Sequence, residues 1–360
     1  MIPIAKPQIS QNEKDAVMAV LDSGMIACGQ TVTDFEMAFA AYVGTDSGIA
    51  TTSGTTALEV ALRSLGIGTG DEVITTAWSF IASTNSIIYT GARPVFADID
   101  ENTFNIDLDL LEEALIAHPG AKAMLIVHLF GRPCDMDRIT ALARKYDVKL
   151  IEDCAQAHGA EWKGKKVGSF GDAAAFSFYP TKNMTTGEGG IVLTNAAETE
   201  RNARLLINHG MERRYYHDAV GYNYRMTNIA AAIGLEQLKR LDGFNEARRA
   251  NAKRYSVGIK NPLVERPLEQ DGSKHVYHQY TIKVKDGRRD DLIKLFEDAG
   301  IGYGVFYPCS IPEQPAYNGM GFPTEWPVAD KVKNQVLSIP VHPGLSEGDV
   351  DEVIAAINSL

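Results

Sequence analysis

The sequence predicts an α/β fold, in which helices cover a mainly parallel sheet, followed by a smaller α+β domain. From residue 48 to 195, short apolar runs alternate with stretches of helical periodicity, the pattern of βαβ units. Beyond about residue 245 the pattern changes to isolated strands and helices separated by longer loops. We therefore expect a large domain at 1–245, with an extended arm at 1–9, and a small C-terminal domain at 246–360.

Each expected helix and strand is predicted by its own sequence pattern. Ser10 and Glu13 form a capping-box pattern that opens a first helix. A strand-like run over 47–52 leads into a helix at 55–65. Apolar runs predict buried strands at 72–76, 94–98, 123–129 and 148–152, and helical periodicity predicts helices at 107–117 and 135–146.

The C-terminal part contains one long helical region over 226–256, whose apolar stripe is broken by charges. After it we expect an exposed strand at Tyr280–Val284, a helix at Arg289–Ala299 and another strand at Tyr303–Tyr307. A proline-rich loop then precedes a last helix at Glu347–Ile357.

Composition narrows the class of protein. Of the 360 residues, 45% are apolar and 22% charged, which is typical of a soluble globular protein. The net charge of −11 argues against a nucleic-acid binder. The four cysteines are widely spaced, which indicates free thiols in a reducing compartment. With no signal peptide or membrane span visible, we expect a cytoplasmic protein without a membrane partner.

The chemistry is concentrated in three segments, IEDCAQAHGA (151–160), FSFYPTKN (176–183) and TTGEGG (185–190). Asp153 ends an apolar strand, and Ser177 and Lys182 follow on a second apolar segment. Pyridoxal phosphate needs this set: a carboxylate keeps its pyridine nitrogen protonated, hydroxyl and backbone N–H groups hold its phosphate, and a lysine amine forms the Schiff base. The order of these groups predicts a pyridoxal phosphate site.

A second candidate for phosphate binding is Ser53-Gly54-Thr55, where a strand-like run meets a helix. The N-terminus of a helix presents unpaired N–H groups and a positive dipole, which suit a phosphate. Serine and threonine are also ordinary N-cap residues, so this segment alone leaves both interpretations open.

Each residue has a plainer alternative. Lys182 could be a surface lysine, Asp153 a strand-end cap, and Phe80 part of the core. The glycine clusters at 66–70 and 300–304 each follow a helical stretch, so they indicate helix ends rather than a dinucleotide site. The histidines have no metal-ligand spacing, and we expect no metal.

The chain resembles the DegT/DnrJ/EryC1/StrS family of nucleotide-sugar aminotransferases over nearly its whole length. The resemblance is carried by the three segments above and by four more: TSGTTALEVALRSLGIGTGDEVI, FIASTNSIIYTGARPVFADID, HGM…GYNYRMTNIAAAIGLEQL and VLSIPVHPGLSEGDVDEV. The resemblance implies the aspartate-aminotransferase (type I) fold and pyridoxal 5'-phosphate. It makes Lys182 the Schiff-base lysine and Asp153 the partner of the pyridine nitrogen. The remaining implied cofactor contacts are Phe80 against the ring, Gln156 near its phenolic oxygen, and Gly54, Thr55 and Ser177 at the phosphate.

The resemblance also implies a homodimer with shared active sites, because Asn223 is similar to the family asparagine that reaches the phosphate in the neighbouring subunit. Lys182 favours transamination, since family dehydratases carry histidine there. The chain departs from the family at Pro312, which stands where many members have a histidine, so a sugar contact assigned to that position does not carry over. Tyr307 and Tyr317 remain candidates for the substrate pocket.

The substrate's diphosphate should meet positive charge, and Arg213, Arg214 and Arg225 are the nearest candidates, although a solvated basic loop explains them equally well. From the resemblance we expect transfer of an amino group from L-glutamate to a nucleotide-linked keto-hexose, with a 4-keto-6-deoxy sugar favoured, in amino-sugar and polysaccharide biosynthesis. Two alternatives remain: a regulatory or scaffold protein that binds pyridoxal phosphate without transamination, and a different pyridoxal phosphate reaction such as desulfuration, for which Cys309 is the only cysteine in a loop.

Overall fold

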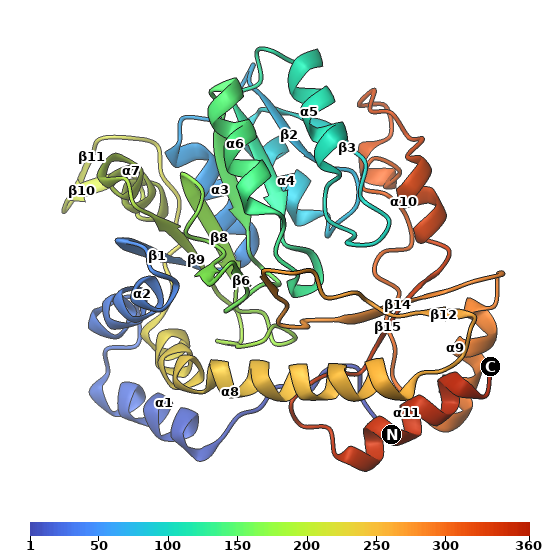
Figure 1. Cartoon of the computed structure of the whole chain (residues 1–360). Coiled ribbons are helices and arrows are strands. Elements are labelled where there is room, and N and C mark those ends of the chain that lie inside the picture. Colours follow the sequence, from blue (N-terminus) through green and yellow to red (C-terminus); the bar gives the residue numbers. More distant parts are fainter.

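A seven-stranded sheet forms the centre of the computed structural model, which describes all 360 residues (Figure 1). The strand order is β1-β9-β8-β5-β4-β2-β3. Strands β3, β2, β4, β5 and β8 run parallel, whereas β9 is antiparallel to both of its neighbours, β8 and β1. The mainly parallel sheet is therefore confirmed. Its strands are β1 (Ser47–Thr51), β2 (Glu72–Thr76), β3 (Arg93–Ala97), β4 (Ala123–Val127), β5 (Lys149–Asp153), β8 (Ala173–Ser177) and β9 (Gly190–Thr194).

Helices cover both faces of this sheet, because alternate residues of each strand point to opposite sides. Ala173, Ala175 and Val192 belong to the buried cluster on one face, and Ala174, Phe176 and Ile191 to the cluster on the other. The first face carries α3 (Gly54–Ser64), α4 (Ala82–Thr90) and α7 (Ala197–Ile207). The second carries α2 (Gln30–Val43), α5 (Leu108–Ala117), α6 (Met136–Tyr146) and the first half of α8 (Asn228–Gly258).

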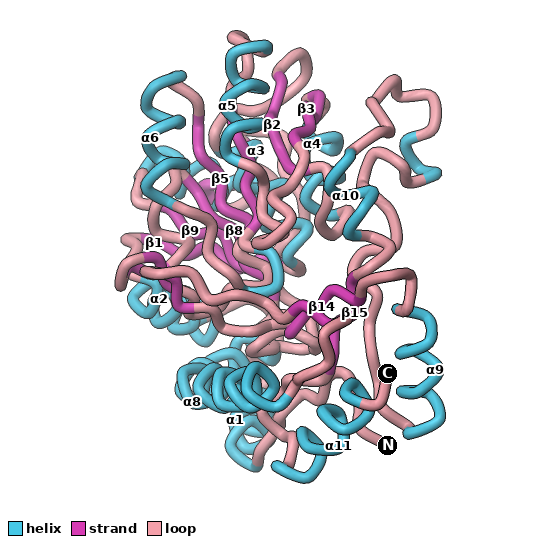
Figure 2. The backbone as a smooth tube through the Cα atoms, turned by 45° about the vertical axis from the view of Figure 1, so that its right-hand side comes forward, coloured by secondary structure: helices cyan, strands magenta, loops and turns pink.

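A smaller three-stranded sheet, in the order β12-β14-β15, lies beside the other half of α8 (Figure 1). It packs against α9 (Arg289–Ala299) and α11 (Glu347–Asn358), and both chain termini lie near these helices (Figure 2). Its strands are β12 (Val264–Glu265), β14 (Tyr280–Val284) and β15 (Val336–Ile339). The other elements are α1 (Gln11–Ser23), α10 (Pro327–Val332), the short strands β6 (Glu161–Trp162), β7 (Lys165–Lys166) and β13 (Ser273–Lys274), and the hairpin β10 (Met211–Arg213)–β11 (Tyr216–His217).

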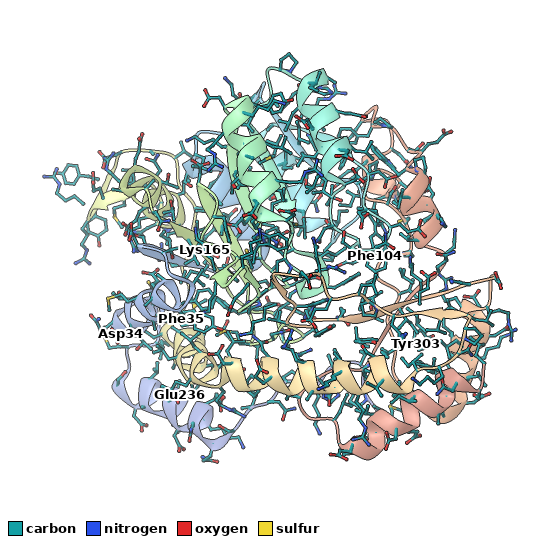
Figure 3. All side chains as sticks on the ribbon, in the orientation of Figure 1. Asp34, Phe35, Phe104, Lys165, Glu236 and Tyr303 are labelled. Atoms are coloured by element: carbon teal, nitrogen blue, oxygen red, sulfur yellow. The ribbon has the colours of Figure 1, made fainter.

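Helix α8 connects the two sheets as one continuous helix of 31 residues. It begins after Thr227, whose hydroxyl accepts a hydrogen bond from the N–H of Ala230. Gly234 lets α2 approach closely: a Cβ there would lie 2.7 Å from the ring of Phe35, which is labelled in Figure 3. The domain boundary predicted near residue 245 therefore lies inside α8, and the division into two domains stays a prediction.

The N-terminal arm is extended and packs along the molecule. Ile2 pairs with Ile301, and the carbonyl of Gln8 accepts hydrogen bonds from Gln237 at 2.9 Å and Arg240 at 3.2 Å, both on α8. The capping box of Ser10 and Glu13 is present at the start of α1.

Two expectations about the C-terminal part are wrong. The strand Tyr280–Val284 is buried at every residue rather than exposed, because it is the central strand of the smaller sheet. Residues 303–307 form no strand and contribute only an isolated bridge between Gly304 and Ser338. The glycine-rich helix ends are confirmed, since Gly300 caps α9 in the left-handed region, with φ of 67°.

Candidate active site

Asp153 ends β5 at the carboxyl edge of the parallel strands, where α/β folds bind ligands. Ser83, on α4, donates a hydrogen bond from Oγ to Oδ2 of Asp153 at 2.7 Å, and the N–H of Ala155 donates to Oδ1 at 3.0 Å. Burial raises the pKa of Asp153, while these two hydrogen bonds and the positive charge of Lys182 act in the opposite direction. The carboxylate is thus buried and held in a fixed orientation.

Lys182 lies on the segment between β8 and β9, residues 178–189, here named the Lys182 loop. Its backbone N–H donates to the carbonyl of Tyr179 at 2.9 Å, which forms a tight turn around Pro180. Burial lowers the pKa of Lys182 to about 8, although the charge of Asp153 acts to raise it. About a tenth of the amine is therefore neutral, and nucleophilic, at pH 7, far more than for a lysine of ordinary pKa.

The N-terminus of α3 meets the end of β8 at Gly54 and Ser177. A Cβ on Gly54 would lie 2.5 Å from Cβ of Ser177, so only glycine allows this approach. Ser53 caps the helix by accepting a hydrogen bond from the N–H of Thr56 at 3.2 Å. The first N–H groups of a helix have no partner inside it, so Gly54 and Thr55 present theirs next to the hydroxyl of Ser177. The helix cap is confirmed, and the anion-binding interpretation is compatible with it but stays a prediction.

Phe80, Gln156 and Tyr307 form the next part of the site. The side chain of Phe80 is 53% exposed, which excludes the plain core role, and its ring centroid lies 6.2 Å from that of Tyr307. Gln156 donates from Nε2 to the hydroxyl of Tyr307 at 3.1 Å and accepts from the N–H of Phe130 at 2.7 Å. The amide of Gln156 is therefore held with a defined orientation.

The remaining residues predicted for the site differ in their exposure and in their hydrogen-bond partners. Asn223 is exposed, and Arg225 donates to Oδ1 of Asn208 at 2.8 Å. Tyr317 is buried in a cluster with Phe96, and its hydroxyl donates to Asn85 at 2.7 Å. The roles suggested for these residues stay predictions.

Arg213 and Arg214 lie on the exposed hairpin β10–β11, which projects beside α7 (Figure 1). Their guanidinium groups lie over the rings of Tyr216 and Tyr215, at 3.7 Å and 5.0 Å from the ring centroids. Neither pairs with a carboxylate inside the chain. Both charges are therefore free to meet an anion.

The structure also brings together residues that the sequence analysis did not connect. Ser83 precedes Asp153 by 70 residues, and no sequence motif predicts the hydrogen bond between them. His128, Glu152 and Cys154 form a buried cluster under the site. Nδ1 of His128 accepts from the N–H of Cys134 at 3.1 Å, so Nε2 carries the proton and donates to Glu152 at 3.1 Å. These bonds occupy both nitrogens of His128, which thereby links Glu152 of β5 to the backbone at Cys134.

The buried carboxylate, the lysine of lowered pKa and the helix N-terminus are groups that a phosphorylated cofactor with a protonated ring requires. A model of the DegT/DnrJ/EryC1/StrS aminotransferase family matches residues 7–358. The chain belongs to this family of aminotransferases, its relatives include nucleotide-sugar transaminases, and its cofactor is pyridoxal 5'-phosphate.

Known relatives match over almost their whole length. The chain is 43% identical to GDP-perosamine synthase of Caulobacter vibrioides, covering 100% of this chain and 98% of the relative. It is 40% identical to a pleiotropic regulatory protein of Geobacillus stearothermophilus, covering 96% and 94%. The crystal structure of DesV from S. venezuelae, in complex with a ketimine intermediate, superimposes with a TM-score of 0.93 at 38% identity, covering 97% and 94%.

The type I aminotransferase fold is thereby established, as are the aminotransferase class and the cofactor. None of the helices has the length and hydropathy that a membrane span requires.

Proposed function

We propose that this protein transfers the amino group of L-glutamate to the 4-keto group of a nucleotide-linked 4-keto-6-deoxy hexose, in the biosynthesis of an amino sugar for a polysaccharide. The observation that carries the proposal is the presence of Lys182, whose pKa is lowered to about 8, together with a buried and oriented Asp153 whose charge acts on it. The 43% identity to GDP-perosamine synthase supports a GDP-linked sugar as the first substrate to test.

The residues present fit pyridoxal phosphate. Asp153 would pair with the ring nitrogen. Gly54, Thr55 and Ser177 would hold the phosphate at the N-terminus of α3, where Ser177 leaves no room for a side chain on residue 54. Phe80, exposed on one side, would cover the ring. When bound, the cofactor supplies a conjugated ring that withdraws electrons from the carbon bearing the amino group.

The chain's own residues then move the proton. Lys182 would hold the cofactor through its amine. With the amino donor bound instead, the free amine of Lys182 would take the proton from Cα of the donor as a general base and later give it back as a general acid. Asp153 would keep the ring nitrogen protonated, and the amide of Gln156 would contact the phenolic oxygen of the ring.

We further propose a cytoplasmic homodimer in which Asn223 of each chain reaches the phosphate in the other chain's site. The exposure of Asn223 supports this, because an exposed side chain is accessible to a second subunit. In the same dimer, Arg225 and the free charges of Arg213 and Arg214 are candidates for the substrate's diphosphate, and Tyr307 and Tyr317 for its sugar.

The test is the visible absorption spectrum of the purified protein with pyridoxal phosphate, before and after L-glutamate is added. We expect a Schiff-base band that glutamate converts to the pyridoxamine form. Incubation of that form with GDP-, dTDP- and UDP-linked keto-sugars should then restore the band for the true substrate only. A band that glutamate leaves unchanged would contradict the proposed donor, and no band at all would contradict the site.

A regulatory protein that binds the cofactor without turnover is the second candidate, and the relative named as a pleiotropic regulatory protein is the observation that favours it. It predicts a Schiff-base band that no amino donor changes. A cysteine desulfurase would instead respond to L-cysteine, so comparing cysteine with glutamate as donor separates that reaction.

A further inference from the structure

Two buried polar residues of α8, Asn245 and Arg248, face the segments that carry the catalytic groups. They are spaced i, i+3, so they share one side of the helix. Their side chains are 2% and 5% exposed, and neither forms an ion pair. Burying an amide and an unpaired guanidinium is costly unless their hydrogen bonds are well placed.

Asn245 joins the two catalytic segments directly. It donates from Nδ2 to the carbonyl of His158 at 2.8 Å, in the segment that follows Asp153. Its Oδ1 accepts from Nδ2 of Asn183 at 2.8 Å, and Asn183 is the residue after Lys182. This approach needs Gly159, since a Cβ there would lie 2.8 Å from Nδ2 of Asn245.

Arg248 holds a third segment, which leads into β14. Its Nη1 donates to the carbonyls of Tyr277 at 3.2 Å and His278 at 3.3 Å. Asn183 reaches the same segment, because its Nδ2 also donates to the carbonyl of Val276 at 3.1 Å. Asn183 and Arg248 therefore approach residues 276–278 together.

One donor and one acceptor in this group have no partner among protein atoms. They are Nε of Arg248 and Oδ1 of Asn183, both buried. Both residues line a single cavity of about 20 Å³, next to Lys182 and under residues 6–8 of the N-terminal arm. This volume holds one water molecule, and a water can accept from Nε while donating to Oδ1.

We propose that Asn245 and Arg248 are positioning residues that hold the Lys182 loop against the segment after Asp153, and that one ordered water bridging Asn183 Oδ1 and Arg248 Nε completes the link. The proposal rests on the proposed function, in which Lys182 and Asp153 act on the same cofactor. A misplacement of about 1 Å between such groups costs roughly a hundredfold in rate. A buried, fully bonded network is suited to prevent it.

The test compares Asn245→Ala with Asn251→Ala in the protein loaded with pyridoxal phosphate. Asn251 is a matched control, because it lies on the same helix and donates to a carbonyl, that of His342, at 3.2 Å. We expect Asn245→Ala to lower kcat by roughly ten- to a hundredfold, with little change in KM. It should also shift the pH midpoint at which the absorption of the bound cofactor changes. Asn251→Ala should leave both unchanged.

Equal effects of the two variants, or an unchanged kcat and pH midpoint in Asn245→Ala, would overturn the positioning role. If Asn245→Ala does not fold, Arg248→Lys removes the Nε donor while keeping the charge, and the same shifts are expected from it. A wild-type protein that forms no cofactor band would contradict the proposed function instead.

A crystal structure that resolves ordered water tests the bridge without any activity. We expect one water within hydrogen-bonding distance of Asn183 Oδ1 and Arg248 Nε. Density without a water between these atoms would overturn that part of the proposal.

Discussion

Ser83 donates a hydrogen bond of 2.7 Å to Oδ2 of Asp153, and this contact ties α4 to the functional end of β5. The carboxylate has only one other donor inside the chain, the N–H of Ala155. Ser83 therefore supplies one of the two hydrogen bonds that favour the charged form of a buried acid.

Replacing Ser83 with alanine should weaken binding of pyridoxal phosphate. A hydrogen bond to a charged group contributes about 1.5–3 kcal/mol, so we expect a loss of roughly ten- to a hundredfold in affinity. The measurement is a titration of the apo protein with the cofactor. Ser86→Ala is the control, because Ser86 is a buried serine of the same helix whose hydroxyl donates to the carbonyl of Ser83. Equal affinity in Ser83→Ala and the wild type would contradict the prediction.

Lys182→Ala should abolish turnover while the fold stays intact, because the variant has no amine to hold the cofactor or to move the proton. Activity and circular dichroism measured together check this. The exposed Lys165, changed to alanine, should keep full activity. Turnover at the wild-type rate in Lys182→Ala would show that another group does the chemistry.

The rate at which the apo protein combines with pyridoxal phosphate should follow the titration of Lys182. Since only the neutral amine attacks, the rate should be highest above pH 8, the pKa to which burial lowers this group, and fall about tenfold per unit at lower pH. Asp153→Asn removes a negative charge that raises the pKa of Lys182, so the midpoint should move to lower pH. A midpoint that stays in place, or rises, would contradict the assigned electrostatic contact.

Gly54→Ala should separate α3 from β8, because the new Cβ would lie 2.5 Å from Cβ of Ser177. Overpacking of this kind costs about 1–3 kcal/mol of unfolding free energy. If the gap holds the phosphate, affinity for pyridoxal phosphate should fall much more than affinity for pyridoxal. Gly68→Ala is the control, since its nearest neighbour is the carbonyl of Thr90 at 3.9 Å. Equal losses for the two ligands would argue against the phosphate role.

Much of the fold could be predicted from the sequence because its strands are short, apolar and regularly spaced. Strand β2 and helix α9 have the predicted bounds, Glu72–Thr76 and Arg289–Ala299. Strand β14 also has the predicted bounds but not the predicted exposure. Its alternation of apolar and polar residues is typical of a half-exposed strand, yet Thr281 bonds to Ser338 and Lys283 to Glu265. Tertiary partners that satisfy buried polar groups leave no local signal in a sequence.

The same reason explains what was missed at the site. Lys182, Asp153 and the glycine loop are close in sequence, and their order could be interpreted directly. Ser83 reaches Asp153, and Asn245 reaches Asn183, only because β5 and α8 lie beside distant segments. Such contacts become visible once the strand order and the course of α8 are known.

Because α8 is one continuous helix that packs against both sheets, it also constrains where the chain can gain or lose residues. Each residue inserted into a helix turns everything beyond it by about 100° and advances it by about 1.5 Å. An insertion before Asn245 would therefore rotate Asn245 and Arg248 away from the Lys182 loop and turn the smaller sheet around the helix axis. Length changes are compatible with the fold in the surface loops, whereas inside α8 a single added or lost residue would put its two halves out of phase.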